Sequence, residues 1–184
     1  MIKYLGSKRL LVPAIVRAAQ ALPEVERVLD LFSGTSRVGH ALKRAGFDVI
    51  ANDHLAYAET LARCYVQADA TRWREPAEQL IRELAEVAPD AGYFTETFCE
   101  RSRFFQPMNG ARIDAIRESI ASRQLHPELE AIALVSLMEA ADRVDSTTGV
   151  QMAYLKQWAA RASKPLALRM PDVLPGRGLA LGLD

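Results

Sequence analysis

The sequence predicts an α/β fold with a parallel sheet, and three features of its first seventy residues indicate this. A short apolar run over residues 26–32 ends at Ser33-Gly34, a helical pattern over residues 38–45 ends at Gly46, and a second apolar run covers residues 48–51. Short apolar runs are typical of buried strands, and apolar residues three and four positions apart are typical of a helix. A strand, a helix and a strand in this order form a parallel pair whose ligand edge lies at the carboxyl ends of the strands.

The other predicted elements are mainly helices. Residues 10–21 are expected to form a helix before the first strand. Apolar spacing predicts further helices over residues 76–87, 112–122, 129–144 and 150–162. We expect a loop rich in aromatic residues and arginine between Asp90 and Gly110, and extended or loop structure after Ser163, where prolines and glycines are frequent.

The composition indicates one ordinary domain with a sizeable core. The chain has 184 residues, of which 49% are hydrophobic, and 23 basic residues balance 23 acidic residues. No apolar run approaches the ~18 residues that cross a bilayer, and the composition excludes a disordered chain. Any contact with nucleic acid must therefore come from a local basic surface. Cys64 and Cys99 lack the spacing of a zinc site or a disulfide framework, so we expect no metal and a cytoplasmic location.

Acidic residues end both predicted strands, at the edge where this kind of sheet binds ligands. Asp30 precedes the turn residue Gly34, and Asp53 ends the second strand. The turn lacks the three glycines of a phosphate cradle, and a carboxylate at Asp30 repels a pyrophosphate. That carboxylate suits the ammonium group of S-adenosylmethionine, and Asp53 has the spacing of an acid that binds ribose hydroxyls. The alternative is an ordinary crossover in which both acids only cap turns.

Motifs spread over most of the chain carry a family resemblance. They are Tyr4-x-Gly6-Ser7-Lys8, Asp30-Leu31-Phe32-Ser33-Gly34, Asn52-Asp53, the segment from Asn109 to Arg117, and the turn at residues 147–150 with Ala153-Tyr154-Leu155-Lys156-x-Trp158 after it. In this combination the sequence resembles the Dam-type DNA adenine-N6 methyltransferases. The resemblance implies a Rossmann-like sheet of the S-adenosylmethionine-dependent methyltransferase type, present in part, with a mainly helical DNA-recognition insertion. It also implies site-specific methyl transfer to adenine in double-stranded DNA, as in restriction-modification systems.

The resemblance assigns residues to two sites. The cofactor-binding residues would be Tyr4, Lys8, Asp30, Phe32, Ser33, Gly34 and Asp53. The segment over residues 93–123 matches the position where such enzymes contact DNA, and its candidate DNA-binding residues are Arg101, Arg103, Asn109, Arg112 and Arg117. Arginine forks suit phosphates and base edges, and the neighbouring aromatic rings can stack on bases. The alternative for this segment is a solvated helix face beside a hydrophobic loop.

One part of the family pattern is absent. Adenine methylation in the resembled family depends on an Asp-Pro-Pro-Tyr motif, and no two of the nine prolines of this chain are adjacent. We therefore expect a truncated methyltransferase that is inactive alone, with a cofactor-binding part over residues 1–71, a helical insertion over residues 72–162 and a return segment over residues 163–184. Its first strand would then have an unpaired edge and exposed apolar surface. A complementing C-terminal methyltransferase fragment is a candidate partner.

Two alternative functions remain open on the sequence. The first is a non-catalytic DNA-binding or split-enzyme complementing module that keeps the front half of the fold. The second is a nucleotide-binding oxidoreductase domain, which Asp30 and the incomplete glycine pattern disfavour.

Overall fold

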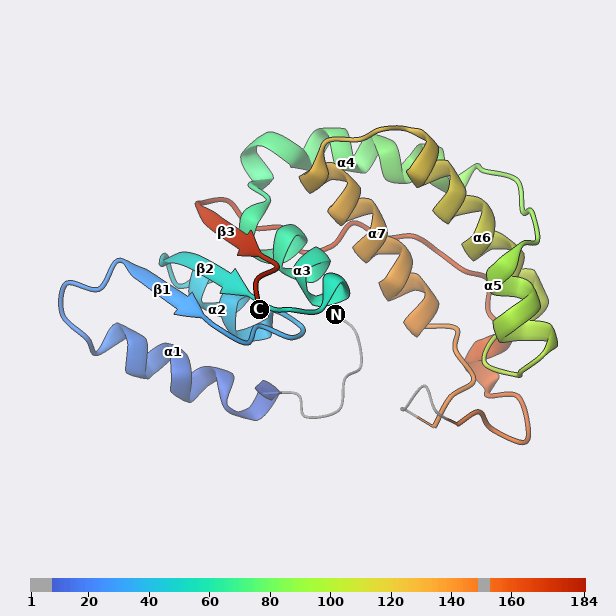
Figure 1. Cartoon of the computed structure of the whole chain (residues 1–184), viewed down its shortest axis with the longest axis horizontal. Coiled ribbons are helices and arrows are strands. Elements are labelled where there is room, and N and C mark those ends of the chain that lie inside the picture. The colour runs from blue at the N-terminus through green and yellow to red at the C-terminus, as the bar shows by residue number, and fades with distance from the viewer. Residues whose placement is uncertain (1–7, 149–152) are drawn as a thin grey trace. The chain divides into compact units, whose positions relative to one another are not determined.

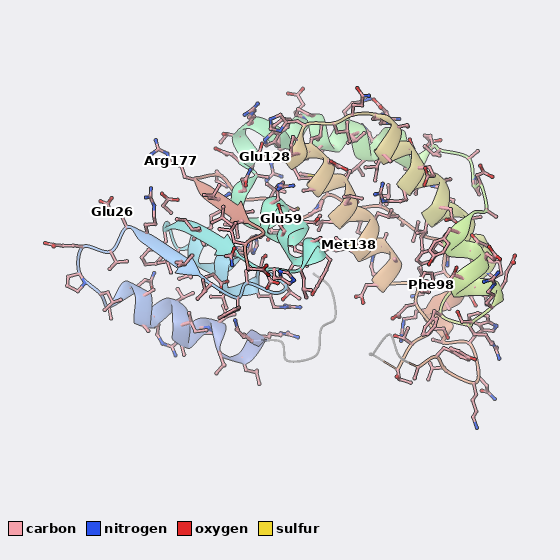
Figure 2. The ribbon with its side chains drawn as sticks, in the orientation of Figure 1. Glu26, Glu59, Phe98, Glu128, Met138 and Arg177 are labelled. Carbon is pink, nitrogen blue, oxygen red and sulfur yellow. The ribbon has the colours of Figure 1, made fainter. Side chains whose placement is uncertain are left out.

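A computed structural model describes residues 8–148 and 153–184 of the chain. These residues form two compact units (Figure 1). The strand unit comprises residues 8–77, 126–135 and 171–184, and the helical unit comprises residues 78–125, 136–148 and 153–170. Within the described residues, no helix is long and apolar enough to cross a membrane.

The helices and strands alternate at first and then become mainly helical, and the label η marks short 3-10 or π-helical turns. In chain order they are η1 (Lys8–Leu10), α1 (Val12–Gln20), β1 (Arg27–Asp30), α2 (Arg37–Arg44), β2 (Asp48–Asn52), α3 (Ala56–Ala62), η2 (Arg63–Gln67), α4 (Ala70–Ala85), α5 (Tyr93–Thr95), η3 (Glu96–Glu100), α6 (Pro107–Ser122), α7 (Pro127–Asp142), η4 (Ala160–Ser163) and β3 (Gly178–Leu181).

The strand unit contains a parallel sheet with the strand order β1-β2-β3. Asp30 of β1 lies opposite Ala51 of β2, and Ala51 lies opposite Ala180 of β3. The carboxyl ends of all three strands therefore meet at one edge. This arrangement confirms the predicted α/β class and the predicted parallel pair. It also leaves β1 at the edge of the sheet, with no strand of the described chain beyond it.

Helices of the strand unit cover only one face of this sheet. The core on that face consists of Val38, Leu42, Val49, Ala51, Ala62, Val66 and Ala180, and partly buried residues of α1 pack against it. Right-handed crossovers that proceed in one direction across a sheet place their helices on the same face. The opposite face carries an apolar row in which Leu29, Ile50 and Leu179 are neighbours in the register. Leu29 is 56% exposed and Leu179 is 43% exposed, so this face is open to solvent.

The helical unit is held together by the apolar faces of its helices. Ile113, Ile116 and Ile120 of α6 are buried, as the spacing predicts for one face of a helix. Helix α4 begins at Ala70, six residues before the predicted start at residue 76. The Asp69 carboxylate caps this earlier start, because it accepts hydrogen bonds from the Thr71 N–H at 2.9 Å and the Thr71 hydroxyl at 2.8 Å. The observed α7 matches the predicted helix to within two residues at each end. By contrast, α6 begins at Pro107, five residues before the predicted start and inside the segment expected as a loop.

One predicted helix is wrong. Residues 153–159, the described part of the predicted helix over residues 150–162 that precedes η4, are not helical. Their main-chain groups bond outside the segment instead: the Leu155 N–H donates to the Ser146 carbonyl at 3.0 Å, and the Ala159 N–H donates to the Ser146 hydroxyl at 3.1 Å. These tertiary hydrogen bonds replace the bonds that a helix would make within itself.

Candidate functional site

The edge where β1 and β2 end brings together several of the predicted cofactor-binding residues. The Asp53 carboxylate accepts hydrogen bonds from the Gly34 N–H at 2.8 Å and from the Leu55 N–H at 3.1 Å. The Ser33 N–H donates to the Asn52 carbonyl at 2.9 Å. The turn after β1 is therefore fixed against the end of β2, and we call this edge the strand-end site.

Asp30 is the buried acid of the strand-end site. It is 8% exposed, and within the described chain its carboxylate accepts one hydrogen bond, from the Gly39 N–H at 3.2 Å. Burial raises the pKa of Asp30 above its usual range, against the opposing effects of the Lys8 charge and the Gly39 hydrogen bond. The pKa is raised further by the nearby Asp53 carboxylate. Asp30 is thus a carboxylate with spare acceptor capacity in a place where a negative charge is poorly solvated.

The turn beside Asp30 has the features of a ligand cradle. Gly34 has a φ of +51°, and a Cβ atom built on it would meet nothing within 4 Å. The hydroxyl oxygens of Ser33 and Ser36 are buried, and neither finds a hydrogen-bond partner among the described residues. A buried polar atom without a partner is costly unless a ligand or water satisfies it. The Asp30 carboxylate and these two hydroxyls therefore fit a ligand that carries both a cation and hydroxyl groups.

Two other predicted cofactor residues are near this turn. The Lys8 ammonium donates a hydrogen bond to the Phe32 carbonyl at 3.2 Å, and the Phe32 side chain is 74% exposed. An exposed aromatic ring at a ligand edge offers a flat surface for a base. Tyr4, which the resemblance also assigns to this site, lies outside the described residues.

The predicted DNA-binding residues divide into exposed and engaged groups. Arg101 and Arg117 are exposed, and the Arg101 guanidinium pairs with the Glu96 carboxylate. Arg103 is also exposed; its guanidinium donates to the Lys156 carbonyl at 3.0 Å and lies 4.9 Å from the centre of the Trp158 ring. These three arginines keep contact with solvent.

Asn109 and Arg112 bind main-chain groups of the helical unit instead. Asn109 is 1% exposed; its amide donates to the carbonyls of Ala162 at 3.2 Å and Lys164 at 3.0 Å and accepts from the Leu166 N–H at 2.9 Å. The Arg112 guanidinium donates to the Ala85 carbonyl at 2.7 Å and to the Val87 carbonyl. In this structure both side chains hold segments of the protein together.

Asp114 is a structural residue that the sequence reasoning missed. Its carboxylate accepts four hydrogen bonds: from the N–H groups of Gly92 at 2.9 Å, Phe94 at 2.8 Å and Thr95 at 2.8 Å, and from the Thr95 hydroxyl at 2.7 Å. Burial alone would raise its pKa, but these hydrogen bonds outweigh burial and lower the pKa below its usual range. The bonds also explain why residues 93–100, expected as a loop, form the turns α5 and η3.

The segment after Asp145 lies largely in the predicted insertion over residues 72–162 and carries part of the family resemblance, but none of its residues was predicted to bind DNA. It contains no Asp or Glu from residue 146 to residue 171, whereas it carries Lys156, Arg161, Lys164 and Arg169. That charge pattern was visible in the sequence and marks a basic stretch. Its position beside Arg103 is visible only in the structure.

Comparisons with known proteins agree with the resemblance. A model of the D12 class N6 adenine-specific DNA methyltransferase family matches residues 4–174. The chain is 33% identical over 147 residues to type II methyltransferase M.NlaIII of Neisseria lactamica, which covers 76% of this chain and 43% of that protein. It is 29% identical over 191 residues to type II methyltransferase M.FokI of Planomicrobium okeanokoites, covering 93% of this chain and 29% of that protein.

A third relative has a similar likeness. The chain is 27% identical over 177 residues to type II methyltransferase M.CviAII of Paramecium bursaria Chlorella virus 1, covering 89% of this chain and 52% of that protein. The chain thus spans about half the length, or less, of these three relatives. No solved structure matches it. The extent of the family match, from residue 4 to residue 174, shows that the chain belongs to the D12 class N6 adenine-specific DNA methyltransferases.

Proposed function

We propose that the strand-end site binds S-adenosylmethionine and that the chain serves site-specific methylation of adenine N6 in double-stranded DNA. The observation that carries the proposal is the buried Asp30 carboxylate, with one hydrogen bond and a raised pKa beside the open turn at Gly34. A cation next to this carboxylate would offset its desolvation. S-adenosylmethionine offers an ammonium group, ribose hydroxyls and an adenine ring, and it has no phosphate for Asp30 to repel.

Each residue of the strand-end site has a distinct part in this proposal. Asp30 binds the ammonium group of the cofactor, and Asp53 binds the ribose through acceptor positions that the Gly34 and Leu55 N–H groups leave available. Ser33 supplies a polar contact, and Phe32 lies against the adenine. The resemblance also assigns contacts with the cofactor to Lys8 and Tyr4. When bound, the cofactor supplies a methyl group on a sulfonium centre.

We place DNA recognition in the helices and loops between β2 and β3, in agreement with the predicted insertion over residues 72–162. The exposed Arg101, Arg103 and Arg117 support a DNA-facing surface there. Asn109 and Arg112 contribute by holding that segment in place, because their polar groups bond to main-chain carbonyls. The three-part division of the chain remains part of this proposal.

A second polypeptide segment would complete the enzyme. The 184 residues contain no Asp-Pro-Pro-Tyr motif. Parallel sheets are normally covered on both faces, yet the face that carries Leu29 and Leu179 is open and the outer edge of β1 is unpaired in the described chain. A strand added at β1, followed by a helix on the open face, would bury this row and continue the sheet. We propose that a complementing methyltransferase segment with the catalytic motif binds there in a cytoplasmic modification system.

The exposed Arg101, Arg103 and Arg117 also support a second candidate function. In that alternative the chain is a non-catalytic DNA-binding module that retains the cofactor half of the fold. Methyl transfer after addition of a complementing segment favours the first function, and DNA binding without it favours the second.

Calorimetric titration with S-adenosylmethionine tests the strand-end site. We expect binding by the wild type and a loss of affinity of at least about tenfold in Asp30→Ala and Asp53→Ala, because each variant removes a charged acceptor. Asp90→Ala removes an exposed acid of the helical unit and serves as the matched control. Equal heats in all four proteins would refute the assignment of both acids.

A methylation assay tests the complementing segment. We expect no transfer to duplex DNA by the pure chain, and transfer after addition of a polypeptide that covers the part of M.NlaIII outside the match. Leu29→Lys places a charge in the open sheet face and is expected to prevent this rescue, whereas Leu22→Lys, at another exposed leucine, is expected to allow it. Transfer by the pure chain would contradict the need for a second segment.

A further inference from the structure

Two segments far apart in the sequence meet on the surface of the helical unit. The Arg103 guanidinium donates to the Lys156 carbonyl at 3.0 Å, and its carbon lies 4.9 Å from the centre of the Trp158 ring. The rings of Phe104 and Tyr154 meet edge to face at 5.3 Å. The loop after η3 and the segment before η4 therefore form one surface. Figure 1 shows the orange loop that contains residues 153–159 at the same end of the helical unit as α5.

Buried Ser146 fixes these two segments in position. Its N–H donates to the Phe104 carbonyl at 2.7 Å, and its carbonyl accepts from the Leu155 N–H at 3.0 Å. Its hydroxyl accepts from the Ala159 N–H at 3.1 Å. Because Ser146 is 0% exposed, these bonds form out of solvent, and the surface has a defined shape before any partner arrives.

The charge of this surface is one-sided. Arg103 and Lys156 are exposed, and neither makes an ion pair among the described residues. The nearby cations Arg101 and Arg161 are neutralised by Glu96 and Asp145, respectively. Tyr154 is 45% exposed, and its ring contacts that of Phe104, the residue after Arg103. The surface thus presents two cations without ion pairs and an exposed aromatic ring.

We propose that the surface formed by Arg103, Tyr154, Lys156 and Trp158 binds the backbone of double-stranded DNA. Arg103 and Lys156 contact phosphates, Tyr154 packs against the adjoining sugars, and Trp158 holds the Arg103 guanidinium in position through stacking. The assignment rests on the proposed function for its ligand class. It moves the DNA contact from Asn109 and Arg112, which bond to main-chain carbonyls, to a segment in which the sequence predicted no DNA-binding residue.

Binding of a fluorescently labelled duplex of mixed sequence, followed by anisotropy over a range of salt concentrations, tests this surface. Lys156→Glu and Arg103→Ala are each expected to weaken binding about tenfold and to reduce the salt slope by about one, since each removes a phosphate contact. Arg82→Glu makes the same charge change as Lys156→Glu at an exposed position of α4, and it is expected to stay within about twofold of the wild type. Equal losses in Arg82→Glu and Lys156→Glu would overturn the proposal.

A second pair of measurements separates this surface from the strand-end site and from misfolding. Arg103→Lys keeps the positive charge but loses the planar guanidinium that stacks on Trp158. We therefore expect an affinity for the duplex between those of the wild type and Arg103→Ala. All variants are expected to bind S-adenosylmethionine and to give the same circular dichroism spectrum as the wild type, which shows that both units fold. A wild type that binds the cofactor but no duplex at low salt would overturn the surface and leave the cofactor site standing. Duplex binding that these variants do not alter would overturn the surface and leave the DNA function standing.

Discussion

Asp30 in the strand unit and Asp114 in the helical unit are both shielded carboxylates that accept main-chain hydrogen bonds, yet their environments differ in one respect. Asp114 accepts four hydrogen bonds of 2.7 to 2.9 Å, and its pKa is lowered despite burial. Asp30 accepts one hydrogen bond of 3.2 Å within the described chain, and burial raises its pKa. The number of donors therefore decides whether burial or hydrogen bonding controls the carboxylate.

The difference separates a structural acid, Asp114, from the proposed binding acid, Asp30. Asp114 has its acceptor capacity filled by the turns that it caps, so it has little left for a ligand. Asp30 has capacity to spare and lies beside buried hydroxyls of Ser33 and Ser36 that also lack partners in the described chain. Sites that bind ligands commonly keep such unsatisfied groups at a cost in stability.

The largest expected effect on stability comes from removing the structural acid. Asp114→Ala leaves three N–H groups and a hydroxyl without their acceptor, so we expect the free energy of unfolding of the helical unit to fall by about 2 to 4 kcal/mol. Urea unfolding followed by circular dichroism measures this change. Glu118→Ala removes an exposed acid one turn later on α6 and is expected to cost at most about 0.5 kcal/mol. Similar losses in the two variants would contradict the role of Asp114.

The proposed binding acid, Asp30, is expected to behave in the opposite way. Asp30→Asn removes a poorly solvated charge but keeps an oxygen that can accept from the Gly39 N–H. We therefore expect the free energy of unfolding to stay constant or to rise by up to about 1 kcal/mol. We expect the affinity for S-adenosylmethionine to fall at least about tenfold in the same variant. Asp48→Asn, at the start of β2, removes the charge that pairs with Arg27 on the surface. This variant is expected to lower the free energy of unfolding slightly. A strong destabilisation by Asp30→Asn would assign Asp30 to structure rather than to binding.

The dependence of stability on pH sharpens the same contrast. The lowered pKa of Asp114 means that its stabilisation is present above the unfolded-state pKa near 3.8 and is lost as the pH falls through the folded value. The raised pKa of Asp30 means that its penalty is absent in acid and appears as the pH rises from 3.8 through the folded value. Thermal melts between pH 3 and 7, roughly the range in which carboxyls titrate, measure this contrast. The stability of the wild type relative to Asp114→Ala should increase with pH, whereas its stability relative to Asp30→Asn should decrease with pH. Parallel profiles would contradict this contrast.

The smallest expected effect concerns Cys99, which lies in the turn that Asp114 holds. Burial, with a further contribution from the Asp114 charge, raises the pKa of the Cys99 thiol to about 11. We therefore expect no labelling of native Cys99 by a thiol reagent near neutral pH, and labelling after unfolding. In Asp114→Ala the rate should increase about tenfold, because the turn opens more often. Rapid labelling of the wild type would show that the turn is open without the mutation.

The sequence predicted the position of some candidate site residues but not the contacts of others. Asp30, Gly34 and Asp53 follow from strand length and turn chemistry, which are local properties, and the structure places them at one edge. The roles of Asn109 and Arg112 were not readable from the same kind of pattern. An exposed arginine and one that caps a helix end have the same sequence signature until the partner segment is known.

The sequence by itself determined the parallel strand–helix–strand unit, the family and the acids at the strand ends, because these depend on periodicity and on motifs that are continuous in the chain. Only the tertiary structure decided which polar groups are satisfied. The partners of Asn109 lie up to 57 residues away, and those of Asp114 lie up to 22 residues away. Residues 153–159 are not helical as predicted, because their main-chain groups form hydrogen bonds with Ser146 instead. Hydrogen bonds between distant segments depend on the packing of the whole unit, which local patterns do not encode.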